Sequence, residues 1–212
     1  MTIGMWPCFV ISGSVSRLAA FQERLPLPWP WVRPVYYRAV WGLHTGAPAA
    51  FGGPPGAWGC WRTHARIWED VFSQVLPGAI VLEDDCIFAG LREAWAAAAA
   101  EFVAALPTDW DLAYLGGQHL LPPLAVAPGL QKGVDVNRTH AYLVRSTPRT
   151  QAAYWRLCEM RPSTGRRPHV DYVLGELQKA GALTAYCPAR WLCGQAAGVS
   201  DITGKPCVER YF

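Results

Sequence analysis

The sequence lacks the features that would assign it at once to several common classes of protein. It contains no uninterrupted run of about 18 apolar residues, so no segment is predicted to span a membrane. No basic region followed by an apolar stretch opens the chain, so no secretory signal peptide is expected. Charge is sparse as well: 19 Lys and Arg against 16 Asp and Glu leave a net charge of +3. This charge is too near zero to indicate nucleic acid, or any other partner, by itself.

The cysteines lack a recognisable pattern. There are seven of them, an odd number, and no pair has the CxxC spacing. This argues against a disulfide framework and against a structural zinc site, and it favours buried thiols in a reducing compartment. Together these absences predict a cytoplasmic protein, which would be peripheral to the inner membrane if it works there and in the host cytoplasm if it is viral.

The sequence is rich in apolar residues (51%) and has 11 Trp among its 212 residues, enough to bury a sizeable core. Short apolar runs predict strands at 8–11, 35–40, 79–82, 111–115, 140–144 and 183–186. Helical spacing predicts helices at 16–24, 62–76, 91–106 and 170–180, with another opened by Thr147 and Pro148. Two Gly- and Pro-rich stretches, 42–59 and 120–132, are expected to be irregular loops. This alternation predicts one α/β domain over 1–212, with a mostly parallel sheet flanked by helices.

The most informative motif is the carboxylate triplet Glu83-Asp84-Asp85, which directly follows the buried strand at 79–82. The triplet therefore lies at the carboxyl end of the strand, where open α/β sheets bind ligands. Side chains alternate in an extended segment, so Glu83 and Asp85 are expected to face one way and Asp84 the other. Such a pair can hold Mg²⁺ or Mn²⁺ and leave room for phosphate oxygens. The alternative is an inert, solvated acidic turn.

Around this triplet the sequence resembles glycosyltransferase family 25. The stretch from Gly59 to Trp68, followed by Ile80 to Asp85, is similar to the central signature of that family, and further similar stretches follow the family's order at 10–17, 109–117, 139–144, 168–171 and 195–202. Two positions depart from the pattern: Thr63 stands where the family has Ser, and Trp41 where it has an acidic residue. The resemblance implies a GT-A type, Rossmann-like fold with a nucleotide-sugar-binding half (about 1–118) and an acceptor-binding half (about 119–212).

The resemblance also implies a reaction: metal-dependent, inverting transfer of a hexose from a nucleotide sugar, such as a UDP-hexose, to an acceptor hydroxyl. The implied ligands of Mn²⁺ or Mg²⁺ are Glu83, Asp85 and the late Asp201, and the expected donor-binding residues are Ser12, Arg17, His64, Glu83 and Asp84. Asp171 is the candidate general base, with a plain helix cap as the alternative and Asp111 as the second choice. For His64 the alternative is packing near Trp68, and for Arg17 it is a position on the helix surface.

The acceptor stays open between a saccharide, which the family implies, and a hydroxymethylated base in DNA. Arg161, Arg166 and Arg167 form a basic loop that, with Trp155, could hold a polyanionic acceptor, or could simply be solvated. In the DNA case Trp155, or Trp29 or Trp31 of a loop, would stack on an extruded base. A non-catalytic sugar-binding module of the same fold is a further alternative. A metal-dependent phosphohydrolase is a weaker one, because the usual His/Asp spacing is missing.

Overall fold

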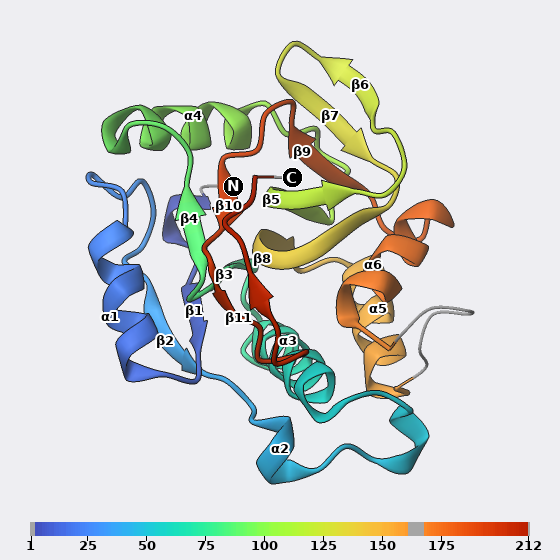
Figure 1. Ribbon diagram of the computed structural model, residues 1–212. Helices are drawn as coiled ribbons and strands as arrows, with labels where there is room; N and C mark the ends of the chain where they lie inside the picture. Colours follow the sequence, from blue (N-terminus) through green and yellow to red (C-terminus); the bar gives the residue numbers. More distant parts are fainter. Residues whose placement is uncertain (1–2, 161–167, 212) are drawn as a thin grey trace.

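A central sheet of eight strands organises the chain in the computed structural model, which describes residues 3–160 and 168–211 (Figure 1). The strand order is β2-β1-β3-β8-β5-β9-β7-β6. Its strands are β1 (Cys8–Ser12), β2 (Val35–Arg38), β3 (Gly78–Glu83), β5 (Leu112–His119), β6 (Leu124–Ala127), β7 (Leu130–Gly133), β8 (Val136–Arg145) and β9 (Ala185–Pro188). The pairs β1–β2, β1–β3 and β5–β9 are parallel, and β7 and β8 run against the other strands. The predicted α/β fold with a mostly parallel, Rossmann-like sheet is therefore confirmed.

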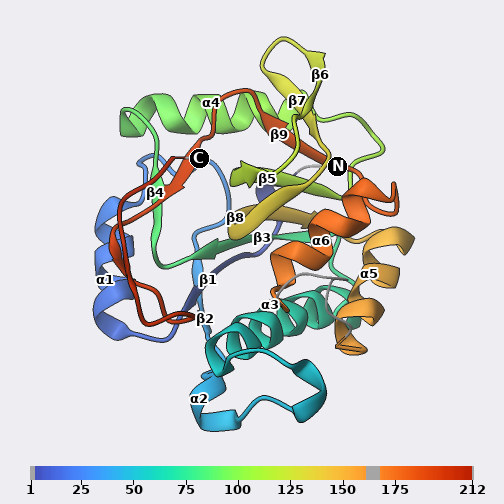
Figure 2. The ribbon, with the colours of Figure 1, turned by 45° about the vertical axis from the view of Figure 1, so that its right-hand side comes forward.

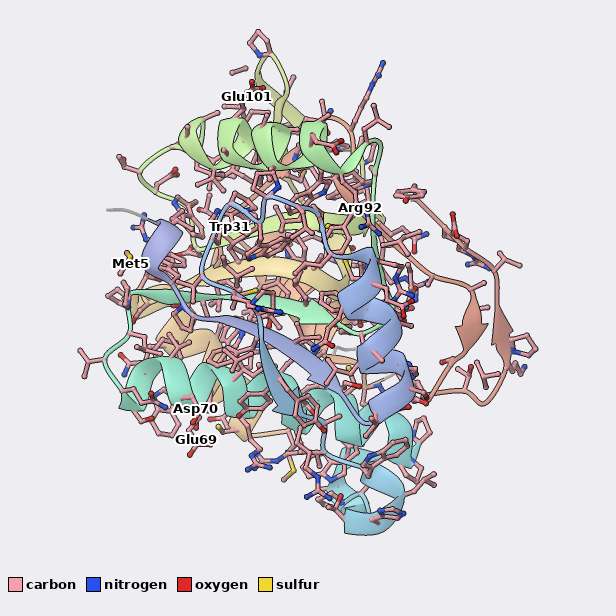
Figure 3. The ribbon with its side chains drawn as sticks, turned by 90° about the vertical axis from the view of Figure 1, so that its left-hand side faces the viewer. Met5, Trp31, Glu69, Asp70, Arg92 and Glu101 are labelled. Atoms are coloured by element: carbon pink, nitrogen blue, oxygen red, sulfur yellow. The ribbon has the colours of Figure 1, made fainter. Side chains whose placement is uncertain are left out.

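Helices cover both faces of this sheet. One face carries α3 (Pro55–Ser73), α5 (Pro148–Cys158) and α6 (Val170–Lys179), and the other carries α1 (Val15–Arg24) and α4 (Arg92–Ala104). Figure 3 shows the sheet between α4, marked by Glu101, and α3, marked by Asp70. Along β3, Ala79 and Val81 pack on the α3 side, whereas Ile80 and Leu82 pack on the α1 and α4 side. This alternation directs Glu83 toward α3 before the strand ends.

The structure corrects the interpretation of the two Gly- and Pro-rich stretches. The first contains α2 (Gly42–Thr45), a 3₁₀ turn (Ala49–Phe51) and the first part of α3, which begins seven residues before the predicted start at Arg62. Proline suits the first turn of a helix because its missing N–H would have no partner there. The second stretch, 120–132, contains most of the antiparallel hairpin β6–β7, which turns at Gly129 with φ +76°. Composition alone did not distinguish these elements from irregular loops.

The segment after β9 also contains structure that the sequence did not predict. β10 (Cys193–Gln195) pairs with the short strand β4 (Cys86–Phe88) that follows the carboxylate triplet, and β11 (Gly198–Val199) pairs with β12 (Pro206–Cys207). In Figure 2 this red segment runs over the end of β3 and beside α1. The chain end thus covers the region that the triplet occupies.

Two expectations from the sequence concern what is absent. All seven cysteines are free, and four of them are buried, as expected for thiols outside a disulfide framework. Within 3–160 and 168–211, no helix combines the length and the apolar character needed to cross a bilayer.

Candidate functional site

A cavity of about 390 Å³ opens at the carboxyl ends of β1, β2 and β3. The end of β1, helix α1, the α2–α3 region and the segment after β10 form its walls. Seven of the predicted site residues line it: Ser12, Arg17, His64, Glu83, Asp84, Asp85 and Asp201. Asp171 and Trp155 are not in this lining, and Arg166 and Arg167 lie outside the described residues. The residues predicted to bind the donor and the metal therefore meet in one place.

Asp84 faces α1, as the alternation of side chains predicted. Its Oδ2 accepts a hydrogen bond from Ser12 Oγ at 2.5 Å, and its Oδ1 forms an ion pair with Arg17. Arg24 donates to the Asp84 carbonyl at 2.8 Å. Burial raises the pKa of the Asp84 carboxyl, although the bond from Ser12 and the charge of Arg17 oppose that rise. Asp84 thus fastens α1 to the end of β3.

Glu83 faces α3 and belongs to a buried hydrogen-bond network. Its Oε1 accepts from Thr139 Oγ1 at 3.0 Å and from His64 Nε2 at 3.2 Å. His64 Nδ1 lies 3.0 Å from the hydroxyl of Tyr142, which accepts from Trp68 Nε1 at 3.0 Å. The Tyr142 proton therefore points at Nδ1 in the neutral histidine, and the Nε2 proton points at Glu83. Burial works to raise the pKa of Glu83, but the bonds from His64 and Thr139 lower it below its usual value.

The position of His64 agrees with the packing alternative and also gives it access to the cavity. Its side chain is almost fully buried beside Trp68, as the packing alternative required, yet it also lines the cavity and reaches Glu83. One turn of α3 separates it from Cys60, which lines the same wall.

Asp85 has the least satisfied carboxylate of the triplet. Its Oδ2 accepts from Gln195 Nε2 at 2.7 Å, but its buried Oδ1 has no hydrogen-bond partner among the described residues. Burial and the negative charge of Glu83 raise the pKa of Asp85 to about 7. An unpartnered buried carboxylate oxygen is costly unless a cation or a proton satisfies it, so this atom fits a metal ligand.

Asp201 is occupied by another partner. Its Oδ2 lies 2.5 Å from Arg17 Nη1, so Arg17 joins the β3 end to the C-terminal segment. Within the described part of the chain, the compact group of metal-ligand side chains is Cys60, His64 and Glu83, and neither Asp85 nor Asp201 belongs to it. In this arrangement Asp201 Oδ2 serves the ion pair with Arg17.

Asp171 lies behind the cavity wall. It is the second residue of α6 and not its N-cap, which is His169, although its carboxylate accepts an N–H of the first turn of the helix. Its Oδ2 accepts from the Arg138 N–H at 3.2 Å and its Oδ1 from the Tyr172 N–H at 2.9 Å. Burial raises the pKa of the Asp171 carboxyl. Arg138 lines the cavity, so the candidate base is separated from it by one residue.

Asp111, the second choice of base, supports the fold instead. It is fully buried just before the amino end of β5, and the catalytic candidates lie at the opposite edge of the sheet. Its oxygens accept from Thr147 Oγ1 at 2.7 Å and from the Thr184 N–H at 2.8 Å, and they pair with Arg149. These bonds leave it no role in the cavity.

The predicted stacking tryptophans lie elsewhere. Trp155 is 59% exposed on α5, away from the cavity lining. Trp29 stacks on Trp95 with ring centroids 5.3 Å apart, and Trp31 meets the same ring edge-on at 5.7 Å, next to α4 in Figure 3. Trp29 and Trp31 thus pack against α4, where their rings contribute to the core.

Among the residues that line the cavity, the sequence did not point to Arg138, marked Trp41 only as a departure from the family pattern, and undervalued Gln195. Arg138 has a φ of +79°, and both Asn137 Oδ1 and Asp171 Oδ2 accept from its N–H. No sequence signal marks a non-glycine residue in that conformation. Trp41 also lines the cavity. Its ring packs directly against the backbone of Gly13, where a Cβ would lie 2.5 Å from the ring. Gln195, seen in the sequence only as part of a family-like tail, holds Asp85.

Comparison with known proteins gives a partial relationship. No family model matches the chain. Over 91 residues, 41% of this chain, it is 34% identical to the human protein named inactive glycosyltransferase 25 family member 3, and the match covers 15% of that protein. The solved structure of A197 from STIV aligns with 97% of this chain and 94% of its own, at 10% identity and a TM-score of 0.43. Two fifths of the chain are therefore similar in sequence to a protein of glycosyltransferase family 25.

Proposed function

We propose that this protein is a metal-dependent, inverting glycosyltransferase of GT-A type, which moves a hexose from a nucleotide sugar, most simply a UDP-hexose, to a saccharide hydroxyl. One observation carries the proposal: the cavity at the strand ends is lined both by Asp85, whose Oδ1 has no hydrogen-bond partner among the described residues, and by Arg17, which is partly exposed and paired with the buried Asp84. A diphosphate needs such a combination of a cation site and an arginine. The partial similarity to a glycosyltransferase-family protein supports the same class.

The chain offers ligands that suit Mn²⁺ or Mg²⁺. Asp85 would hold the ion through Oδ1, with Glu83 through its carboxylate or a metal-bound water; Asp201 would contribute Oδ1, since its Oδ2 pairs with Arg17. When bound, the ion would neutralise charge that develops on the leaving diphosphate. Arg17 would contact the phosphates, Ser12 and Asp84 would keep Arg17 in position, and His64 would hold Glu83 in the donor wall.

Asp171 remains the proposed general base for the acceptor hydroxyl. Burial raises the pKa of its carboxyl above the usual value, which makes its carboxylate a stronger base, and it lies directly behind Arg138 of the cavity wall. For Asp171 to reach the acceptor hydroxyl, either the Arg138 side chain must move or the acceptor must enter the cavity beside Arg138. We expect Asp171→Asn to lower turnover by about 10²–10⁴-fold and to leave donor affinity unchanged.

The direct test combines binding and turnover. A thermal-shift screen of nucleotide sugars with and without Mn²⁺ should show stabilisation that needs both, because a ligand that binds only the folded state raises its stability. The selected sugar should then be transferred to an oligosaccharide. No stabilisation by any nucleotide sugar would refute the proposal.

A second candidate is a non-catalytic sugar-binding module, which the name of the human relative favours. That function predicts metal-dependent binding of a nucleotide sugar with neither transfer nor hydrolysis. An acceptor base in DNA stays a weaker alternative, because Trp155, a residue expected to stack on an extruded base, is not part of the cavity lining.

A further inference from the structure

Three side chains of different chemistry meet on the α3 side of the cavity: Cys60, His64 and Glu83. Cys60 and His64 are four residues apart on α3 and therefore project from the same face of the helix. Glu83 ends β3 and points toward that face. One ligand atom from each residue lies within 4.8 Å of the other two. All three residues line the cavity, so a fourth ligand position would be open to it.

We propose that Cys60 Sγ, His64 Nε2 and a carboxylate oxygen of Glu83 bind Zn²⁺, at a site that shares Glu83 with the Mn²⁺ or Mg²⁺ position proposed at Asp85 but lies on the α3 side of the cavity. A thiolate and an imidazole select zinc over the hard cations, which prefer oxygen ligands. Three protein ligands with an open fourth position are typical of reactive or exchangeable zinc sites rather than structural ones. The absence of CxxC spacing speaks against a structural zinc site made of cysteine pairs. It does not bear on a mixed set of one cysteine, one histidine and one carboxylate.

The distances suit the small size of a zinc site. With bonds of about 2.0–2.3 Å, the ligands of a tetrahedral zinc ion lie roughly 3.3–3.7 Å apart. His64 Nε2 and Glu83 Oε1 are already 3.2 Å apart, and the group spans no more than 4.8 Å. Closing the set around an ion therefore needs side-chain shifts of only about 1 Å.

The surroundings also hold the ligands in orientation. Tyr142 lies 3.0 Å from His64 Nδ1 and is itself fixed by Trp68, which sets the plane of the imidazole. Thr139 donates to Glu83 Oε1, and no hydrogen bond from the described residues reaches Glu83 Oε2. Outer contacts of this kind are usual around metal-binding histidines and carboxylates.

The protons balance on binding. In the metal-free protein the Nε2 proton of His64 points at Glu83, and Cys60 is a thiol. Zinc would take Nε2, so the imidazole proton would move to Nδ1 and be donated to the Tyr142 hydroxyl, which can accept a second bond. The Cys60 thiol would lose its proton to solvent. Binding therefore releases one proton and changes the tautomer of His64.

Cobalt substitution tests the site without any enzymatic assay, so its outcome is independent of the proposed transferase function. Full-length, chelator-treated protein should bind one Co²⁺ with a thiolate-to-cobalt charge-transfer band, and Zn²⁺ should abolish the band by displacing the cobalt. Cys60→Ser should remove the band, and His64→Gln should weaken binding by at least about 100-fold. Cys207→Ser is the matched control, because Cys207 is another half-buried cysteine of the same cavity, and it should keep the band.

Alkylation of the wild-type protein removes any dependence on how well the variants fold. Zn²⁺ should slow modification of Cys60 in mapped peptides, while half-buried Cys158 on α5 should react at an unchanged rate. Absence of the charge-transfer band, its survival in Cys60→Ser, or alkylation of Cys60 that ignores Zn²⁺ would each overturn the proposal.

Discussion

At the scale of single residues, three adjacent carboxylates have three different environments. Glu83 accepts from His64 and Thr139, Asp84 is paired with Arg17, and Asp85 keeps one buried oxygen without a hydrogen-bond partner among the described residues. Glu83 ends β3 and the chain turns at Asp84 and Asp85, so each side chain meets a different element. Chemical similarity within the triplet therefore does not imply a shared role.

Replacing Asp85 by Asn should separate ligand binding from stability. Asn keeps a bond to Gln195 but removes a charge that is expensive to bury, so metal-free Asp85→Asn should unfold at the same or a higher temperature than wild type at pH 8. Mn²⁺-dependent transfer should be lost. Calorimetry in chelator and a transfer assay provide the measurements. The matched variant Asp84→Asn should instead lower the melting temperature, because it breaks the pair with Arg17. Normal Mn²⁺-dependent turnover in Asp85→Asn would contradict the assignment.

The buried His140 should make the protein sensitive to mild acid. Burial lowers its pKa from 6.5 to about 4, against the opposing charge of Glu83. The unfolded chain therefore binds this proton first, so the contribution of His140 to stability is complete above pH 6.5 and is lost as the pH falls toward 4. The maximum loss is on the order of 3 kcal/mol.

Denaturant titrations of wild type and His140→Asn between pH 4 and pH 7 measure the contribution of His140 to the free energy of unfolding. The difference in unfolding free energy between the two proteins should shrink as the pH falls, because only wild type loses the contribution of a neutral histidine. A difference that stays constant across this range would show that His140 is already charged in the folded protein, or that it titrates normally.

At the scale of elements, close backbone contacts join α2, α3 and the C-terminal segment around the cavity. A Cβ on Gly42 would lie 1.6 Å from the Pro55 carbonyl oxygen, and one on Gly59 would lie 2.3 Å from the carbonyl oxygen of Val40. A Cβ on Gly56 would lie 2.2 Å from the Asp201 carbonyl oxygen. These glycines allow one wall of the cavity to close. From composition alone, the same glycines were expected to belong to an irregular loop.

Gly42→Ala should therefore destabilise the protein and open this wall. We expect the free energy of unfolding to fall by roughly 1–3 kcal/mol. The added methyl group would meet backbone atoms, which cannot move aside as a flexible side chain could. Gly198→Ala is the control: a Cβ there would meet nothing within 4 Å, so its effect should stay within about 0.5 kcal/mol. Chemical denaturation compares the two variants, and equal stabilities would contradict the close backbone contact between α2 and α3.

At the scale of the whole molecule, the net charge of +3 bears on the acceptor. Transfer to a neutral saccharide should hardly change between 50 and 200 mM salt. If the acceptor were duplex DNA held by Arg161, Arg166 and Arg167, three phosphate contacts would weaken its binding by about 40-fold over the same range. Initial rates with each acceptor across this salt range distinguish the two cases, and a steep decrease with an oligosaccharide acceptor would refute the simple saccharide interpretation.

The sequence by itself determined the main strands and helices, and it placed the carboxylate triplet at the end of a strand. Apolar runs and helical spacing located β1, β3, α4 and α6 to within a few residues, because local periodicity reflects burial on one face. The same pattern placed Glu83, Asp84 and Asp85 at a strand end, and correctly predicted that Glu83 and Asp84 face opposite sides.

The tertiary structure alone decided which residues share the cavity. Gln195 and Asp201 are far from Cys60 in the sequence, and they line the same cavity only because the C-terminal segment folds over the ends of β3 and α3. It also showed that Asp171 is separated from the cavity by Arg138, and that Asp111 supports the opposite edge of the sheet. Such partners depend on long-range packing, which leaves no periodic signal in the chain, so the spacing of residues could not predict them.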